Sequence, residues 1–332
     1  MTELLHKSRF LKQMNISLDL AVEAHDLLRG ESGQEISGVI MNKEEFEDAT
    51  VTAIQITNAR GEKELGRPKG NYITIDAPAV KDNDFEQHKR ITHILANHLS
   101  SLYNIKEDAS FLIVGLGNWQ ATPDALGPKV VEKVMVTRHL FYYTPEETKG
   151  KMRQVAAISP GVLGLTGIET AEVIRGLVEH VKPDYVIAID ALAAGALERI
   201  GTTIQLADTG INPGSGIGNH RKGLNEETLG CKVIAIGVPT VVNAAIIAHK
   251  TVEELFEQME LEPALADIYC EENEPVLINV MKKALSPFQE NLMVTPKDVD
   301  TLIERSARII AGAINQSIHP GITAQNFETY LQ

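Results

Sequence analysis

Short apolar runs alternate with segments of helical periodicity along most of the chain. The runs predict strands at residues 50–57, 72–77, 110–116, 156–158, 185–189, 202–207 and 233–237. Apolar residues at helical spacing predict helices at residues 84–103, 125–136, 169–181 and 240–258, and a last helix that starts at Thr295-Pro296. This alternation is typical of an α/β domain with three layers, α/β/α, around a largely parallel mixed sheet.

The composition excludes several classes of protein. The 332 residues carry a net charge of −14, which argues against a protein that binds nucleic acid. The most apolar long stretch, Val233–Ala248, is interrupted by Pro239 and Asn243, so we expect no membrane span. Two cysteines exclude a disulfide scaffold, and the N-terminus does not resemble a secretory signal. We therefore expect a cytoplasmic protein without nucleic-acid or membrane partners.

Two aspartates lie near the carboxyl ends of predicted strands, where the ligand sites of open α/β sheets are found. Asp124 follows the strand at 110–116, and Asp190 directly follows the strand at 185–189. Burial at such a position favours a pair with one protonated and one ionised carboxyl group. That pair can activate water and protonate a leaving amine, or it can hold a divalent metal. The alternative is that each aspartate caps a helix directly after it.

Three further residues could support this pair. Asp208 opens a glycine-rich loop over residues 208–223, as a turn former or as a third acidic group. His139 follows Arg138 at a predicted helix end, where a histidine meets the helix dipole favourably. His220 lies in a small basic cluster on the loop and could bind an anion, although a solvated loop charge explains it as well.

A glycine pair after the strand at 110–116 raises a different class of function. Gly115 and Gly117 match the start of a dinucleotide-binding fingerprint, but the third glycine is replaced by Gln120. A non-catalytic nucleotide- or anion-binding protein therefore remains the alternative to an enzyme.

Several long segments resemble the germination proteases of endospore-forming bacteria, the endopeptidases that begin the degradation of small acid-soluble spore proteins. The segments that carry the resemblance are residues 19–26, 114–128, 136–140, 158–170, 184–194, 208–219, 235–242 and 291–299. The pattern of residues 115–127 is also similar to that of hydrogenase-maturation endopeptidases, and it implies their phosphorylase/hydrolase-like fold. In those proteins acidic residues with a histidine bind the substrate's metal, and the segment of His220 loosely matches the histidine segment.

The resemblance implies an atypical aspartic-type endopeptidase whose catalytic pair falls on Asp124 and Asp190. Family members are made as zymogens, and their substrates are cut after the acid in an acid–hydrophobe–Ala–x–Glu sequence. The segment that begins Asp19-Leu20 has this form, so we expect self-removal of residues 1–19. The alternative for this segment is an ordinary amphipathic helix.

The remaining expectations concern organisation and partners. Residues 20–332 would form a single peptidase domain, with peripheral excursions at residues 60–70 and 259–274. The resemblance implies a homotetramer in the forespore or spore core that takes small acid-soluble spore proteins as substrate. No cofactor is certain, and a divalent metal held by the same aspartates is the alternative mechanism.

Overall fold

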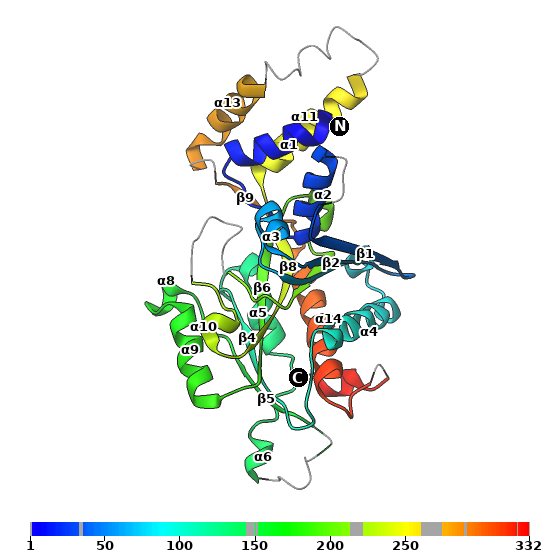
Figure 1. Ribbon diagram of the computed structural model, residues 1–332, viewed down its shortest axis with the longest axis vertical. Coiled ribbons are helices and arrows are strands. Elements are labelled where there is room, and N and C mark those ends of the chain that lie inside the picture. Colours follow the sequence, from blue (N-terminus) through cyan, green and yellow to red (C-terminus); the bar gives the residue numbers. More distant parts are fainter. Residues whose placement is uncertain are drawn as a thin grey trace.

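The computed structural model describes residues 2–32, 36–143, 150, 152–212, 222–259, 274–288, 291–323 and 325–331. Within these residues nine strands form one sheet in the order β1-β2-β3-β7-β8-β6-β4-β5, with β9 paired to β8 (Figure 1). The strands are β1 (Val39–Glu45), β2 (Thr50–Ile56), β3 (Gly70–Asp76), β4 (Ser110–Gly115), β5 (Gln154–Ile158), β6 (Tyr185–Ala194), β7 (Thr203–Ala207), β8 (Lys232–Asn243) and β9 (Met293–Val294).

The sheet has a parallel half and an antiparallel half. Strands β8, β6, β4 and β5 run parallel to one another, whereas the other neighbours, including β7 and β8, pair antiparallel. The predicted α/β class with a mixed sheet is therefore confirmed. Asp190 lies within β6 in the parallel half, directly after the level at which β4 ends, and Asp124 lies in η2 (Thr122–Asp124), which follows β4 in the chain.

Helices cover both faces of the sheet, which gives the three layers. On one face α4 (Phe85–Ser101), α5 (Leu126–Val131) and α14 (Val299–Ile318) pack against alternate residues of β4 and β6 such as Ile113 and Ile187. The other face is covered by α9 (Thr170–Val181), by α10 (Glu226–Leu229) and by the start of α2 (Ala21–Ser32). Helix α3 (Ala59–Leu65) connects β2 to β3 and packs against α2.

A third group of helices lies beyond the carboxyl ends of β6 and β8 (Figure 1). It consists of α1 (Thr2–Gln13), α11 (Ala244–Met259) and α13 (Glu274–Leu285), whose apolar core includes Phe10 and Ile246. The shorter elements are η1 (Pro78–Lys81), η2 (Thr122–Asp124), α6 (Leu140–Tyr143), α8 (Leu163–Thr166), η3 (Leu197–Arg199), η6 (Ser286–Phe288) and η7 (Phe327–Tyr330). None of the helices described is long and apolar enough to cross a membrane.

Several element bounds differ from those predicted. β6 continues five residues past Ile189 to Ala194, and β8 continues to Asn243, where a helix from residue 240 was predicted. The two strands pair along this whole extension, and the inter-strand ladder outweighs the helical propensity of alanine and leucine. The last helix begins at Val299 with Asp298 as its N-cap residue, three residues later than the predicted cap at Thr295. β1, which carries four exposed residues in a row, was not predicted.

Candidate active site

The carboxyl end of β6 extends past the end of β4 and leaves a free strand edge there. The Leu116 amide, directly after β4, donates to the Ile189 carbonyl oxygen at 2.8 Å, and the β4–β6 ladder ends at this point. Amides two residues apart on a strand point to the same side, so alternate amides from Ala191 onward face the space beyond β4. The first of them donates to Oδ1 of Asp190 at 3.0 Å.

Asp190 is buried in the middle of β6, with 5% of its surface exposed. Its partner in β8 is Gly237, and the partner of Gly237 in β7 is Gln205. Because directly paired residues share a face of the sheet, Asp190 and Gln205 lie on one face with a glycine between them. Since β6 continues as a strand, the alternative that Asp190 caps a helix at Ala191 is wrong.

A tight turn after β4 brings Asp124 back to Gly117 and Asn118, which directly follow that strand. Gly117 has a φ of +106°, and a side chain there would collide with the backbone oxygen of Asp124. The Asn118 amide closes the turn by donating to Oδ2 of Asp124 at 2.8 Å. Asp124 is the last residue of η2, and Ala125 is the N-cap residue of α5, so the alternative that Asp124 caps this helix is wrong as well.

Thr240 fixes the η2 turn to the sheet. The β6–β8 register shifts at this point, so that Thr240 has no partner in β6, as at a β-bulge. The buried hydroxyl of Thr240 donates to the Pro123 carbonyl oxygen at 2.6 Å, and η2 packs against both β6 and β8. Thr240 therefore sets the position of the turn that carries Asp124 relative to the strand that carries Asp190.

The N-terminal segment lies along the free edge of β6. Oδ2 of Asp19 accepts from the Ala193 amide at 2.9 Å, and both carboxylate oxygens of Glu23 accept from the Gly195 amide at 3.0 Å. Asp190 accepts from the preceding amide on the same side, that of Ala191. Three carboxyl groups therefore accept from alternate amides along one strand edge, and these amides lie about 7 Å apart. Asp19 is thus the neighbour of Asp190 along this edge.

Gln205 brackets the peptide bond that follows Asp19. Its Nε2 donates to the Asp19 carbonyl oxygen at 3.2 Å, and its Oε1 accepts from the Ala21 amide at 2.6 Å. Leu20, between the two contacts, is fully buried against the same face of the sheet. The Asp19–Leu20 peptide bond therefore lies beside Gln205, on the sheet face that also carries Asp190.

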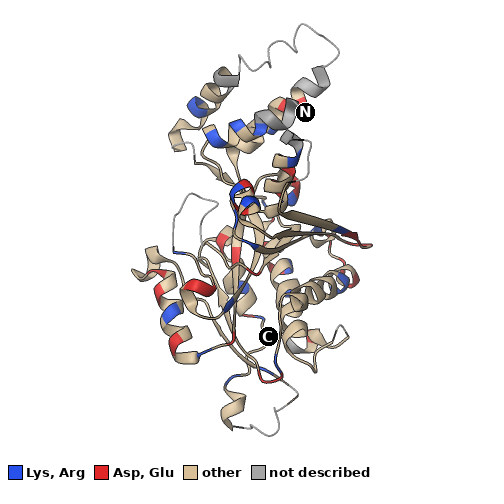
Figure 2. Cartoon of the chain, in the orientation of Figure 1, with Lys and Arg blue, Asp and Glu red and all other residues tan. Residues whose placement is uncertain are grey.

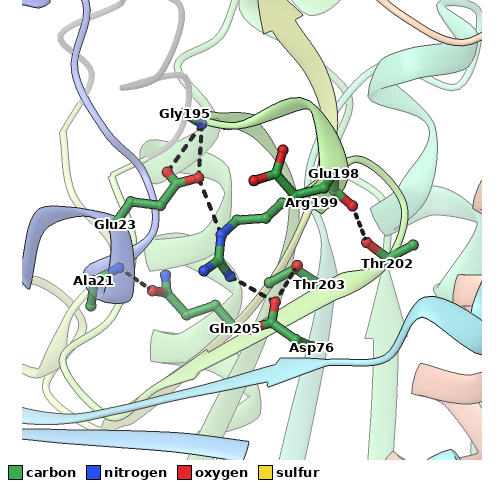
Figure 3. A network of polar contacts seen from close by, with 9 residues as sticks. All are labelled: Ala21, Glu23, Asp76, Gly195, Glu198, Arg199, Thr202, Thr203 and Gln205. Atoms are coloured by element: carbon green, nitrogen blue, oxygen red, sulfur yellow. Dashed lines mark hydrogen bonds and ion pairs between the residues drawn. The ribbon is translucent and has the colours of Figure 1, made fainter. Parts of the chain in front are cut away.

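A polar network holds Glu23 at the far end of this segment (Figure 3). Arg199 Nε lies 3.6 Å from Oε1 of Glu23, and Arg199 Nη1 donates to Oδ1 of Asp76 at 2.7 Å. The hydroxyl of Thr203 donates to the same Asp76 oxygen at 2.6 Å. Burial raises the pKa of Glu23 to about 7, although Arg199 and the Gly195 amide lower it in part.

A cavity of about 690 Å³ lies beside the docked segment. Its walls include Asp19 from the segment, Arg67 after α3, and Leu192 and Gly237 from the sheet. Gly237 is the partner of Asp190, and Leu192 is the next β6 residue on the same face. The cavity therefore borders Asp19 and Gln205 and includes neighbours of Asp190 in its wall, whereas Asp124 and Asp190 themselves do not line it.

The structure describes two of the three supporting candidates, His139 and Asp208. His139 is exposed and directly precedes α6, so its predicted place at a helix C-terminus is wrong. The residues just before it bond to the first residues of β5, which lie at the opposite end of the parallel strands. Asp208 follows β7, and its carboxylate accepts from the backbone and side-chain amides of Asn71 at 2.7 and 2.6 Å, which are long-range contacts and not the local hydrogen bond of a turn former. His220 lies outside the residues that the structure describes.

Among the described residues, no three His, Cys, Asp or Glu side chains gather where they could hold one ion. Within that part of the chain, Asp124 and Asp190 therefore do not belong to such a group of side chains.

Four residues that shape this site were not singled out as site residues by the sequence: Gln205, Arg199, Thr240 and Glu23. Gln205 and Arg199 contact partners more than 120 residues away, and Thr240 was assigned to a helix. Only Glu23 carried a signal, as the last residue of the acid–hydrophobe–Ala–x–Glu segment.

Comparison with known proteins gives consistent matches over almost the whole chain. Residues 19–267 and 268–331 match the family model described as germination protease. A germination protease of Caldanaerobacter subterraneus subsp. tengcongensis is 47% identical over 96% of this chain and 98% of the relative. Relatives of the same name from Clostridium tetani and Bacillus cereus are 44% and 42% identical over 96% of this chain, and over 100% and 98% of their own lengths.

Among solved structures, the [NiFe] hydrogenase maturation protease HycI from Thermococcus kodakarensis KOD1 is similar over 49% of this chain and 96% of that protein. It is 21% identical, with a TM-score of 0.29. A similarity this low has no bearing on the chemistry of the site.

Proposed function

We propose that this chain, which belongs to the germination protease family and is therefore a protease of spore germination, is an aspartic-type endopeptidase. We propose further that it is made as a zymogen that processes itself. Asp124 and Asp190 are its catalytic pair, and its first substrate is its own Asp19–Leu20 bond. The observation that carries this proposal is the docking of that bond beside Gln205, one amide along the β6 edge from Asp190.

The chemistry follows from the groups at the bond. One carboxylate of the pair takes a proton from water, and the oxygen of that water attacks the carbonyl carbon of Asp19. Gln205 Nε2 donates to the carbonyl oxygen, where negative charge develops, and stabilises it. The protonated member of the pair then gives its proton to the Leu20 nitrogen as the C–N bond breaks. The products are a carboxyl terminus at Asp19 and an amino terminus at Leu20.

The position of the bond in the chain also supports self-processing. Residues 16–20 form an irregular linker between α1 and α2, so the bond is not enclosed in a helix. The proposed pro-segment, residues 1–19, includes α1, which carries Lys7, Arg9 and Lys12 and packs against α13 (Figure 2). Its removal would leave residues 20–332 as the peptidase domain and would uncover the wall of the cavity that residues 8–19 now form.

The finer biology is proposed on the family resemblance. We propose small acid-soluble spore proteins as the substrates in trans, the spore core as the location and a homotetramer as the assembly. The first of these is tested by incubating the processed protein with a purified small acid-soluble spore protein and mapping the products by mass spectrometry. Cleavage after acidic residues supports the proposal, and an unchanged substrate, as a nucleotide- or anion-binding protein would leave it, contradicts it.

A further inference from the structure

We infer that Arg67 is a substrate-binding residue whose guanidinium holds the main-chain carbonyl of the residue before the cleaved acid. The inference rests on the proposed function, because it treats the docked N-terminal segment as a substrate bound in cis. The ligand it assigns to Arg67 is a peptide backbone, so the contact does not depend on which side chain precedes the acid.

Arg67 contacts the segment at the peptide bond directly before Asp19. Its Nη2 donates to the Leu18 carbonyl oxygen at 2.7 Å, across 49 residues of sequence. That carbonyl is the one hydrogen-bond acceptor that the described chain offers this guanidinium, although an arginine can donate several hydrogen bonds. Burial lowers the pKa of Arg67, and nearby Tyr72 and Asp19 raise it in part. The Leu18 carbonyl thus provides a contact for a charge that burial disfavours.

The Arg67 side chain is held by groups that processing leaves in place. Gly66 ends helix α3 with a φ of +66° and fixes the backbone that leads into Arg67. The guanidinium carbon lies 5.8 Å from the centre of the Tyr72 ring, within the range of a cation–π contact. The Tyr72 hydroxyl in turn donates to the Pro68 carbonyl oxygen at 2.9 Å. None of these contacts involves residues 1–19, so Arg67 stays in position after they have left.

Removal of the segment opens the place of the Leu18 carbonyl to another peptide. Arg67 and Leu18 both line the cavity of about 690 Å³, and residues 8–19 form part of its wall. Processing takes away the Leu18 carbonyl together with this part of the wall. A peptide that binds with its acid in the place of Asp19 then supplies the same carbonyl to the guanidinium.

Arg67 and Gln205 hold the backbone on either side of the acid, but they act on different carbonyls. Arg67 holds the carbonyl of Leu18, whose charge is the same before and during cleavage. Gln205 holds the carbonyl of Asp19, which gains negative charge in the transition state. Arg67 therefore binds the ground state and the transition state equally, so its loss should raise KM and leave kcat nearly unchanged.

The test compares two peptides on the processed enzyme. One contains Leu-Asp-Leu-Ala-Val-Glu, and in the other a trans carbon–carbon double bond replaces the Leu–Asp peptide bond, which keeps the shape and removes the carbonyl oxygen. A hydrogen bond to a charged group accounts for about 10- to 100-fold in binding, so we expect the wild-type enzyme to prefer the first peptide by this factor in kcat/KM. Residues 20–23 of the enzyme compete equally with both peptides and leave the ratio unaffected.

Variants of Arg67 assign the preference to this side chain. Arg67→Met should raise KM for the first peptide by about 10- to 100-fold with kcat nearly unchanged, and should cleave the two peptides with similar kcat/KM. Arg67→Lys, which keeps a charged donor, should retain part of the preference. Arg60→Met, at an exposed arginine of α3, should retain all of it.

The comparison within the wild-type enzyme needs no variant, so it tests the contact even if Arg67→Met does not fold. Equal kcat/KM for the two peptides in the wild type, or an undiminished preference in folded Arg67→Met, overturns the inference while the endopeptidase function stands. A lower kcat with an unchanged KM in Arg67→Met also overturns it, because Arg67 would then not act through binding. Failure of the wild-type enzyme to cleave the first peptide overturns the proposed function itself.

Discussion

Replacing Glu23 with glutamine should abolish a pH dependence in the docking of the N-terminal segment. Burial raises the pKa of the seated Glu23 to about 7, from an ordinary value of 4.5. Arg199, the Gly195 amide and Lys7 lower this pKa, and Asp19 raises it further, but burial dominates. The seated carboxyl group therefore holds its proton more tightly than the same group does in a detached segment.

The sign and the size of the effect follow from this pKa. The stabilisation is fully present below pH 4.5, where the carboxyl group is protonated in both states, and it is lost as the pH rises through 7. The gap between the two pKa values corresponds to about 3 kcal/mol, or roughly a 300-fold increase in the detached population. Acidification should thus stabilise the docked position of Glu23. Glutamine does not titrate, so in Glu23→Gln the stability of the docked α2 should not change over this pH range.

Native-state hydrogen exchange of the α2 amides measures this directly, on protein whose mass confirms that residues 1–19 are present. After correction for intrinsic exchange, the opening free energy of α2 should fall by about 3 kcal/mol between pH 4.5 and 8 in the wild type and stay flat in Glu23→Gln. Glu86→Gln is the matched control, because Glu86 also lies in the first turn of a helix but is 70% exposed. A flat or rising profile in the wild type, or the same slope in Glu23→Gln, would refute the reasoning.

Three further predictions concern the bond and the pair. Gln205→Leu removes the donor to the Asp19 carbonyl and should slow cleavage of the Asp19–Leu20 bond by about 100-fold, measured by the rate of mass loss, whereas Gln55→Leu, at an exposed glutamine of β2, should not. Thr240→Val frees the Pro123 carbonyl and should lower the unfolding free energy by about 1–2 kcal/mol in urea titrations, with kcat on a peptide reduced more than KM is changed. Processing should proceed at an unchanged rate in excess EDTA; loss of activity that a divalent ion restores would instead support the aspartates as metal ligands.

The sequence predicted the α/β class and most of the central strands because their apolar runs are buried on both faces. It placed the end of β6 too early. Residues 191–194 read Ala-Leu-Ala-Ala, which favours a helix locally, and only pairing with β8 makes them a strand. The part of β6 that was not predicted includes the free edge whose amides donate to the carboxylates of Asp19 and Glu23, so the docking site of the N-terminal segment could not be predicted either.

The candidate pair could be proposed from the sequence because each aspartate follows an apolar run that predicts a buried strand, and such a pattern is visible within a few neighbouring residues. The partners of the docked segment carry no such signal. Gln205 lies in a strand of apolar neighbours, and its contacts with Asp19 and Ala21 span more than 180 residues. Arg199 lies in a short 3₁₀ helix between two strands, and its pairing with Glu23 depends on how the N-terminal segment folds back over the sheet.

The central claim is that Asp190 takes part in cleavage of the bond after Asp19, and intact-mass analysis of the incubated full chain tests it most directly. The wild type should lose residues 1–19 and acquire an amino terminus at Leu20, while Asp190→Asn keeps its full mass with an unchanged near-ultraviolet circular dichroism spectrum. Asp208→Asn, at an aspartate tied to Asn71, should process like the wild type. Processing of Asp190→Asn at the wild-type rate, or a new terminus at another residue, would contradict the account.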